Sequence, residues 1–292
     1  MAGYYAKMTD TFGPLVSTAW LADQAGSGDV IVLDASRHLP AAGRDPRAEF
    51  EAGHIPGARF LDLATLTDAS SEVPAALPRP EQVAQALAEL GVDESARIVV
   101  YDDSAVKTSA RAWFALTQAG VRDVAVLDGG LAKWREEGRT LEAGAGEYAA
   151  TKPRALTNST PKVASKSDML ANCESGVSQV LDARGEDRVF GSGIDPVHGG
   201  QNGRIPGALN LPFGKVFNED GTFKSAPDLR TLFEEAGVDL SKPLVTTCGS
   251  GVTASVLLLA AHIAGKDDVR LYDGSWQEWE ADPDTPKEQG PV

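Results

Sequence analysis

The sequence predicts an α/β protein made of two tandem domains, each a parallel sheet flanked by helices. Three observations support this fold class. The chain has 292 residues, which suits two domains of roughly 130 to 150 residues, each able to bury a core. Short apolar segments alternate with amphipathic segments, as strands joined by helical crossovers do. The two halves also share sequence landmarks in the same order.

The shared landmarks lie at a nearly constant separation. Residues 32–36 read Val-Leu-Asp-Ala-Ser and residues 180–184 read Val-Leu-Asp-Ala-Arg, while Ile-Pro-Gly-Ala occurs at both 55–58 and 205–208. Two further pairs of segments match in the same way: 98–102 with 244–248, and 127–134 with 272–279. A period this long indicates duplicated domains rather than solenoid repeats, whose periods are far shorter.

Composition sets the expected domain boundaries. The segment 144–165 is rich in Gly, Ala, Thr, Ser and Pro and poor in apolar periodicity, which is typical of a linker. We therefore expect an N-terminal domain over residues 8–143 and a C-terminal domain over residues 166–285.

Helices and strands are expected to alternate within each half. In the first half, a helix over 80–90 precedes a strand over 98–101, and a helix over 110–119 precedes a strand over 124–127. In the second half, the repeated Val-Leu-Asp-Ala segment predicts a strand over 180–183. Such alternation indicates a parallel sheet.

A single cysteine interrupts an apolar run in the second half. Residues 244–247 are apolar and β-branched, which predicts a strand, and residues 252–263 are long enough for about three helical turns. Between them, Gly249 and Gly251 permit the positive φ angles that turn backbone N–H groups inward. These donors and the positive end of the helix favour a thiolate, so Cys248 is predicted to be a nucleophile near neutral pH. The alternative is a buried structural cysteine.

The duplication fails at this cysteine. The first half has Asp102 in the matching position, and the loop 103–108 lacks the two glycines. Because an aspartate cannot perform the chemistry of a thiolate, we expect one catalytic half and one non-catalytic, supporting half. The site is expected at the carboxyl end of the strand, where the first domain covers the loop and contributes to substrate binding.

Composition also excludes several classes of function. Hydrophobic residues make up 42% of the chain and charged residues 24%, as in an ordinary globular protein. The formal net charge of −15, with no basic cluster, argues against binding to nucleic acid or anionic membranes. No stretch approaches the ~20 apolar residues of a membrane span, and residues 1–14 lack the core of a signal peptide. With only two cysteines, Cys173 and Cys248, no disulfide framework is possible, and a cytoplasmic location is expected.

The whole chain resembles the tandem rhodanese-domain sulfurtransferases, in which a domain without the cysteine precedes a domain that carries it. The resemblance rests on the paired Ile-Pro-Gly-Ala segments, on residues 128–130 and 272–276, and on the loop 248–254, which is similar to that of 3-mercaptopyruvate sulfurtransferases. Thiosulfate-using rhodaneses usually place Arg-Lys where this chain has Gly249-Ser250, and those cations suit a dianionic donor. The resemblance implies two rhodanese-like domains and no organic cofactor.

The resemblance also implies a reaction. Cys248 would attack the sulfur of 3-mercaptopyruvate, pyruvate would leave, and the sulfur would remain as a persulfide. Ser250 and Thr253 would be catalytic, because their hydroxyls can donate to the sulfur or to the departing carbonyl oxygen. Loop residues that would contact the substrate are Gly249, Gly251 and Val252. The alternative role for both hydroxyls is helix capping.

A keto-acid substrate needs a cation for its carboxylate, and arginine offers a bidentate fork. Arg188 matches an arginine that the family uses in this role, and the alternative is a solvated surface charge. Arg184 either shares the role or holds the sheet edge or a domain contact. The second arginine usual in mercaptopyruvate enzymes is missing from residues 193–198. We therefore expect Arg37 or His38 to reach across the domain interface and replace it.

The remaining chemistry-bearing residues receive structural interpretations. His54 is expected to make a structural hydrogen bond, His262 to be a core or boundary residue of its helix, and Cys173 to be an incidental thiol. An aspartate and a histidine carried by some family members match Ala64 and Ala75 here, so a serine-protease-like triad is not expected. The wide spacing of the histidines and cysteines predicts no metal site.

Three alternatives to a mercaptopyruvate enzyme stay open at this point. The first is a thiosulfate sulfurtransferase, and the second is a sulfur-carrier module that does not turn over. The third is a phosphatase of the same fold, whose loop would end in an arginine where this chain has Ala254. The expected partners are a small-molecule sulfur donor and a thiol, thioredoxin-like or cyanide acceptor.

Overall fold

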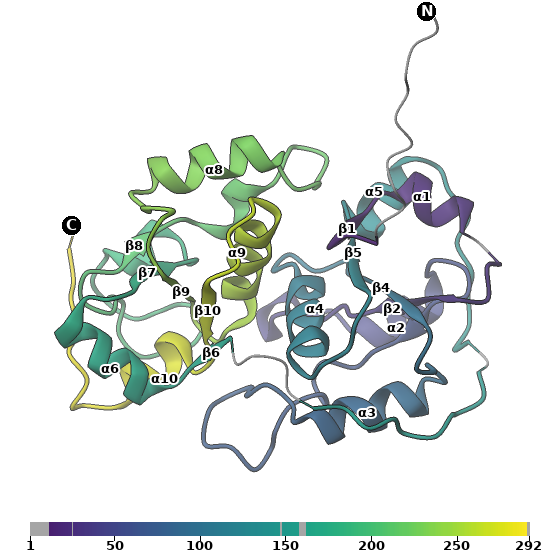
Figure 1. Ribbon diagram of the computed structural model, residues 1–292, viewed down its shortest axis with the longest axis horizontal. Coiled ribbons are helices and arrows are strands. Elements are labelled where there is room, and N and C mark those ends of the chain that lie inside the picture. Colours follow the sequence, from purple (N-terminus) through teal and green to yellow (C-terminus); the bar gives the residue numbers. More distant parts are fainter. Residues whose placement is uncertain (1–11, 25, 147, 158–161, 291–292) are drawn as a thin grey trace, which may run out of the picture.

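The computed structural model describes residues 12–24, 26–146, 148–157 and 162–290, which form two α/β units side by side (Figure 1). Parts of the predicted domain and linker ranges, at 8–11, 25, 147 and 158–161, lie outside the described residues. Each unit holds one five-stranded sheet in which all pairs of strands are parallel. The predicted fold class is confirmed.

The first unit has the strand order β1-β5-β4-β2-β3. Its elements in chain order are β1 (Leu15–Val16), α1 (Thr18–Asp23), β2 (Val30–Asp34), a 3₁₀ helix η1 (Pro40–Ala42), α2 (Pro46–Ala52), β3 (Arg59–Phe60), α3 (Pro80–Glu89), β4 (Arg97–Tyr101), α4 (Thr108–Gln118), β5 (Val124–Leu127) and α5 (Gly130–Glu136).

The second unit repeats this topology with the strand order β6-β10-β9-β7-β8. Its elements are β6 (Val163–Ala164), α6 (Lys166–Ser175), β7 (Gln179–Asp182), α7 (Glu186–Val189), β8 (Leu209–Asn210), a 3₁₀ helix η2 (Phe213–Val216), α8 (Ala226–Glu235), β9 (Leu244–Thr247), α9 (Val252–Ile263), β10 (Val269–Tyr272) and α10 (Ser275–Ala281).

Most predicted elements are present. β5, β9 and α9 begin and end at the predicted residues, and the ends of α3, α4, β4 and β7 lie within two residues of the prediction. The predicted linker 144–165 is wrong at its end, because Val163 and Ala164 form β6 and pair with β10 at the sheet edge. A strand of two residues carries no detectable periodicity, so the sequence pattern did not reveal it.

The internal duplication extends to the contacts that close each unit. His54 forms an isolated bridge with Glu142, and Arg204 forms the matching bridge with Glu288. In both units the glutamate side chain then accepts the N–H of the Gly in Ile-Pro-Gly-Ala, at 2.7 Å and 2.9 Å. The second domain therefore includes residues beyond the predicted boundary at 285.

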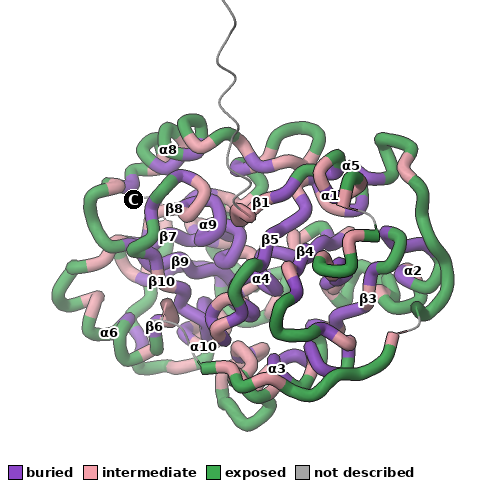
Figure 2. Tube along the Cα trace, turned by 45° about the vertical axis from the view of Figure 1, so that its right-hand side comes forward, coloured by how far each residue is buried: buried purple, intermediate pink, exposed green. Residues whose placement is uncertain are grey.

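The two units pack together through α4 and α9 (Figure 1). One hydrophobic cluster runs through both units and includes Leu116 of α4 and Leu257 of α9. In Figure 2 buried chain forms the interior of both units, and exposed chain forms the periphery. Because α9 packs on β9, β10, α8 and α4 at once, its residues 254–261 are all buried.

We expect Leu257→Ala to destabilise the protein by about 2–5 kcal/mol, because the fully buried side chain would leave a cavity that rigid neighbours cannot fill. The free energy of unfolding in denaturant measures this effect. Leu170→Ala is the matched control, since Leu170 is 38% exposed and should change the free energy far less. Equal losses in the two variants would contradict a shared core at the junction.

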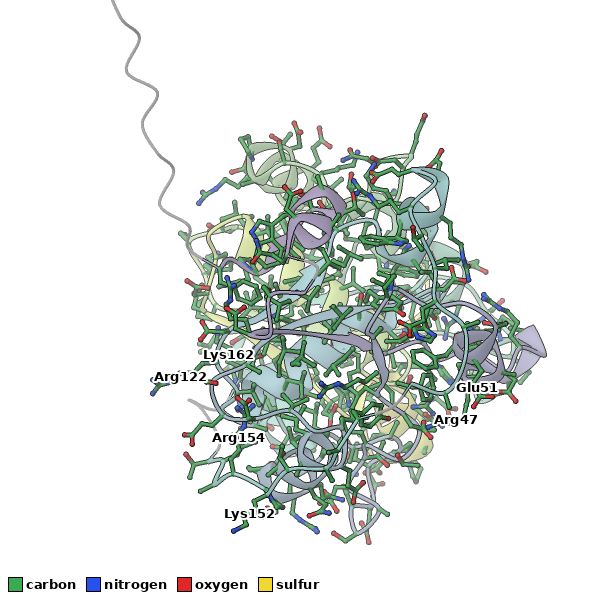
Figure 3. The ribbon with its side chains drawn as sticks, turned by 90° about the vertical axis from the view of Figure 1, so that its right-hand side faces the viewer. Arg47, Glu51, Arg122, Lys152, Arg154 and Lys162 are labelled. Carbon is green, nitrogen blue, oxygen red and sulfur yellow. The ribbon has the colours of Figure 1, made fainter. Side chains whose placement is uncertain are left out.

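Charged side chains occupy the periphery. Figure 3 shows Arg122 and Lys152 projecting from the outer surface of the first unit, and Arg47 and Glu51 lie at another edge. Within the described part of the chain, no helix has the length and apolar character needed to span a bilayer.

Candidate functional site

The carboxyl end of the second sheet opens between β7 and β9. These strands are neighbours, with Asp182 opposite Thr247. After β7 the chain turns towards β8, whereas after β9 it continues to β10 on the other side. Such divergence creates the crevice in which open parallel sheets bind ligands. Cys248 follows β9 directly and Arg184 follows β7 closely, so both lie at this crevice.

Cys248 sits in a loop held from behind by the start of α10. The N–H groups of Trp276 and Gln277 donate to the carbonyls of Cys248 and Gly249, at 2.9 Å and 3.0 Å. The Cys248 N–H donates to Oγ of Ser275 at 3.2 Å. Among the described residues, the N–H groups of positions 249–251 donate to no protein acceptor. These amides and the N-terminus of α9 therefore form a cradle for an anion.

The two glycines of the loop are required for different reasons. Gly251 has a φ of +79°, as predicted. Gly249 does not have a positive φ, so the predicted reason for that glycine is wrong. A Cβ at Gly249 would lie 2.2 Å from Nε2 of His198 and 3.2 Å from Nη2 of Arg188. Glycine is needed there because these two side chains pack against its backbone.

Both units line a cleft of about 400 Å³ at this loop. The first unit contributes residues 37–40 and 74–75, together with Val106 and Thr108. Cys248 lines the cleft from the second unit and is only 2% exposed. Residues of the first domain therefore cover the loop that carries Cys248, as predicted. Their contribution to substrate binding stays a prediction.

Ser250 and Thr253 both line the cleft. The N-cap of α9 is Gly251, and no side chain caps the helix, so the capping alternative for the two hydroxyls is wrong. Both side chains are partly exposed, and no described protein group bonds to either hydroxyl. They are available to a ligand in the cleft. Val252, which lines the same wall, offers an apolar contact.

Arg184 is fully buried at the base of the cleft. Its Nε lies 3.1 Å from both carboxylate oxygens of Asp182, and its Nη2 donates to Asp182 at 2.7 Å and to the Gly203 carbonyl at 2.6 Å. Its guanidinium also lies over the ring of Trp276. This geometry corresponds to the second role considered from the sequence, in which Arg184 holds the sheet edge.

Arg188 reaches the cleft from α7. Its side chain is 16% exposed and donates to Asp195 at 3.0 Å and 2.7 Å, so the alternative of a solvated surface charge is wrong. Burial alone would raise the pKa of Asp195, but the Arg188 hydrogen bond and the Val197 N–H hold that pKa below its usual range. The ionised carboxylate therefore orients the guanidinium at the cleft.

His198 is a cleft residue that the sequence analysis missed. It belongs to the segment in which only a missing arginine was noted, and a lone histidine in a glycine-rich loop carries no motif signal. Burial, and next the positive charge of Arg188, lowers the pKa of His198. Its imidazole is therefore neutral near neutral pH.

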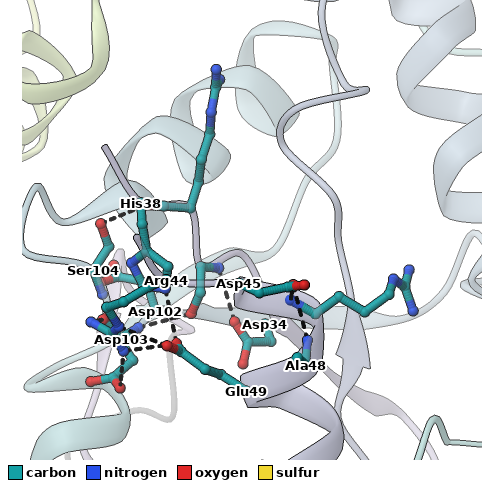
Figure 4. A network of polar contacts seen from close by, with 12 residues as sticks. Asp34, His38, Arg44, Asp45, Ala48, Glu49, Asp102, Asp103 and Ser104 are labelled. Carbon is teal, nitrogen blue, oxygen red and sulfur yellow. Dashed lines mark hydrogen bonds and ion pairs between the residues drawn. The ribbon is translucent and has the colours of Figure 1, made fainter. Parts of the chain in front are cut away.

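The structure distinguishes the two candidates for the missing cation. His38 is paired with Glu49 at 2.9 Å, in a network that also holds Arg44 and Asp103 (Figure 4). Arg37 also lines the cleft, and among the described residues no partner binds its guanidinium. Arg37 therefore has a charge to offer a ligand, whereas the His38 side chain is engaged within the first unit.

Asp102 occupies the position that matches Cys248. Its carboxylate accepts the N–H groups of Ser104 and Ser109, at 2.8 Å and 2.7 Å. These donors belong to the loop and the first turn of α4, which correspond to the anion cradle of the second unit. The first unit thus fills its own cradle with a side chain, which leaves no place for a substrate anion.

Three other predictions concern residues away from the cleft. Nδ1 of His54 donates to the Phe50 carbonyl at 2.8 Å and the residue is buried, as expected of a structural histidine. His262 is a boundary residue paired with Asp267. Cys173 is partly buried, and burial raises the pKa of its thiol.

The positions discussed for rival mechanisms are apolar. Ala75 lines the cleft, whereas Ala64 does not, and Ala254 is fully buried in α9, where no phosphate could reach it. No group of three or more His, Cys, Asp or Glu side chains in the described part of the chain could hold a metal ion.

Comparison with known proteins gives a consistent result. The family model described as "Rhodanese-like domain" matches residues 17–137 and 165–282. Over 272 residues the chain is 40% identical to human 3-mercaptopyruvate sulfurtransferase, and the alignment covers 91% of each protein. It is also 38% identical over 290 residues to the thiosulfate sulfurtransferase of Cricetulus griseus, covering 94% of this chain and 95% of the relative.

A solved structure shows the same similarity in three dimensions. The crystal structure of SseA from Escherichia coli, described as a 3-mercaptopyruvate sulfotransferase, superposes with a TM-score of 0.80 at 36% sequence identity. The match covers 90% of this chain and 98% of SseA.

Proposed function

The chain belongs to the rhodanese family, as a sulfurtransferase with two domains in tandem, and we propose that it takes its sulfur from 3-mercaptopyruvate through a persulfide on Cys248. The observation that carries this proposal is the position of Cys248. It lies in a cradle of backbone amides at a cleft that also holds Arg188 and Arg37, and neither these amides nor the Arg37 guanidinium has a partner among the described residues.

The first step is binding of the donor. Arg188 and Arg37 reach the cleft from opposite units, so the two guanidinium groups can bind the carboxylate of a keto acid between them. This arrangement supplies the second cation that residues 193–198 lack. It also places the sulfur end of the donor towards Cys248.

The second step forms the persulfide. The Cys248 thiolate attacks the donor sulfur, an S–S bond forms, and the C–S bond breaks with its electron pair passing into the enolate of pyruvate. The thiol proton of the donor ends on the methyl carbon of pyruvate, so the persulfide keeps one negative charge. Loop amides bind this anion, and the Ser250 and Thr253 hydroxyls donate to the enolate oxygen as it forms.

The third step transfers the outer sulfur to an acceptor and regenerates the thiolate. We propose a small thiol, a thioredoxin-like protein or cyanide as the acceptor, and a cytoplasmic location, because a reactive thiolate and a second free cysteine both suit a reducing compartment. Repeated turnover with a small thiol would exclude a carrier that loads once.

An intact-mass measurement tests the donor. We expect reduced protein to gain one sulfur atom from 3-mercaptopyruvate, and to gain it less readily from thiosulfate, because Gly249-Ser250 lacks the cations that suit a dianion. Loading from thiosulfate alone would contradict the proposed donor and favour the thiosulfate sulfurtransferase alternative. No loading from either compound would favour a carrier that receives sulfur from another protein.

We expect Arg188→Ala to raise KM for 3-mercaptopyruvate by roughly 10- to 100-fold, since a hydrogen bond to a charged group contributes about 1.5–3 kcal/mol. Arg188→Lys should recover only part of the loss, because an ammonium lacks the planar fork. Steady-state kinetics with cyanide as acceptor measures both effects. The control is Arg79→Ala, which removes an exposed ion pair with Asp68. A similar rise in KM for this variant would contradict a specific role of Arg188 in donor binding.

A further inference from the structure

We propose that His198 selects the sulfur donor through its protonation state, so that the neutral imidazole favours the singly charged keto acid and the imidazolium favours the doubly charged thiosulfate. This inference rests on the proposed function, because it concerns the donor step in the same cleft. It makes His198 a specificity-determining residue rather than a nucleophile or a proton carrier.

The position of the imidazole supports this role. A Cβ at Gly249 would lie 2.2 Å from Nε2 of His198 and 3.2 Å from Nη2 of Arg188. Two side-chain tips therefore converge over the residue that follows Cys248. A donor whose sulfur reaches the Cys248 thiolate must place its anionic end within range of both.

The loop that carries His198 is fixed in place. The N–H of Asp195 donates to the Gly200 carbonyl at 2.9 Å, and the N–H of Asn202 donates to the Gly193 carbonyl at 2.8 Å. Inside this closed loop, the Asp195 carboxylate accepts the N–H groups of Val197 and His198, at 2.8 Å and 3.4 Å. The imidazole is thus held against the catalytic loop and does not extend freely into solvent.

The charges that surround His198 explain why its protonation would determine which donor is favoured. Two cationic side chains at the cleft already have a carboxylate partner, Arg184 with Asp182 and Arg188 with Asp195. The imidazole of His38 is hydrogen-bonded to Glu49. Among the described residues that line the cleft, Arg37 is the cation without a carboxylate partner. One unpaired cation matches a monoanion such as 3-mercaptopyruvate. Protonation of His198 would supply a second, which matches a dianion.

The direction of the pH dependence follows. Burial and the nearby Arg188 and Arg184 charges lower the pKa of His198, and Asp195 opposes them only in part. An ordinary histidine has a pKa of about 6.5. The imidazolium of His198 therefore forms only at a pH below that value. Keto-acid use should dominate at neutral pH, and thiosulfate use should rise as the solution is acidified.

The test is the ratio of kcat/KM for thiosulfate to kcat/KM for 3-mercaptopyruvate, measured between about pH 8 and about pH 5. Both donors load the same Cys248, so effects common to the two loading reactions cancel in the ratio, and donor kcat/KM does not include the acceptor step. We expect the wild-type ratio to rise at least about fivefold on acidification. His198→Asn should hold it low and nearly constant, and His198→Arg should hold it high and nearly constant. His262→Asn, outside the cleft, should behave as wild type.

Two results would overturn the inference alone. One is a wild-type ratio that does not change with pH although Cys248 still loads sulfur. The other is a ratio that rises equally in His198→Asn, which would assign the effect to a different group. Loading of Cys248 in each variant at about pH 8, where histidine is neutral, shows that the variant is folded and competent. If no donor loads Cys248 in the wild type, the proposed function itself fails.

Discussion

Cys248→Ser should lose sulfur transfer by roughly 10⁴-fold or more, because a serine hydroxyl is barely ionised near neutral pH and cannot hold sulfur as a persulfide. The variant should still fold, since the change replaces one small side chain by another in a loop that is fixed by backbone hydrogen bonds to α10. Intact-mass spectra after exposure to 3-mercaptopyruvate should show no added sulfur. A continuous assay of pyruvate release measures the residual rate.

Cys173→Ser is the matched control. Cys173 lies on α6, and burial together with Glu174 raises the pKa of its thiol, so it carries little thiolate near neutral pH. This variant should load sulfur and turn over like the wild type. If Cys173→Ser lost activity and Cys248→Ser kept it, the assignment of the nucleophile would be wrong. Loss in both variants would indicate a transfer between the two thiols.

The fold followed from the sequence because its signals repeat. The duplicated landmarks correspond to equivalent contacts in the two units, such as the glutamates that accept the N–H groups of Gly57 and Gly207. The position of Cys248 in a cleft at the carboxyl end of β9 could also be predicted, because the residue lies between an apolar strand and a glycine-rich loop. Both inferences depend only on neighbours along the chain.

The rest of the site depends on neighbours in space. The sequence suggested that Gly249 was needed for its φ angle, whereas the structure shows that His198 and Arg188 exclude a side chain there. It also left Arg37 and His38 as equal candidates. His38 lies in the loop after β2 and Glu49, its partner, lies in α2, so the pairing appears only when the fold brings the two together.

A second contact that no pattern could reveal joins the two units behind the catalytic loop. Arg111 of α4 and Asp273 of the second unit are both buried, and their side chains meet at 2.7 Å. Asp273 also accepts the N–H of Leu77 at 2.8 Å, and Arg111 donates to the Ala75 carbonyl at 2.9 Å. A Cβ at Gly251 would lie 3.0 Å from both Nη1 of Arg111 and the Asp273 carbonyl.

We therefore expect Arg111→Met to destabilise the protein by about 3–5 kcal/mol, because it leaves the Asp273 carboxylate buried without its partner. Sulfur transfer should fall as well, since the pair packs directly against the catalytic loop. Asp273→Asn in the Arg111→Met background should recover part of the stability, because it removes the uncompensated charge. Unfolding in denaturant measures the stability of each variant, and pyruvate release measures the activity.

A second ion pair at the junction between the units tests whether burial causes the loss of stability expected for Arg111→Met. Lys133 and Asp220 also form an ion pair between the units, at 3.0 Å, but both side chains are solvent-accessible. Water and salt screen such a pair, and its charges keep most of their hydration when the partner is removed. Lys133→Met should therefore have a much smaller effect on stability and leave sulfur transfer unchanged. If Lys133→Met destabilised the protein as much as Arg111→Met, burial of the Arg111–Asp273 pair would not explain its contribution to stability.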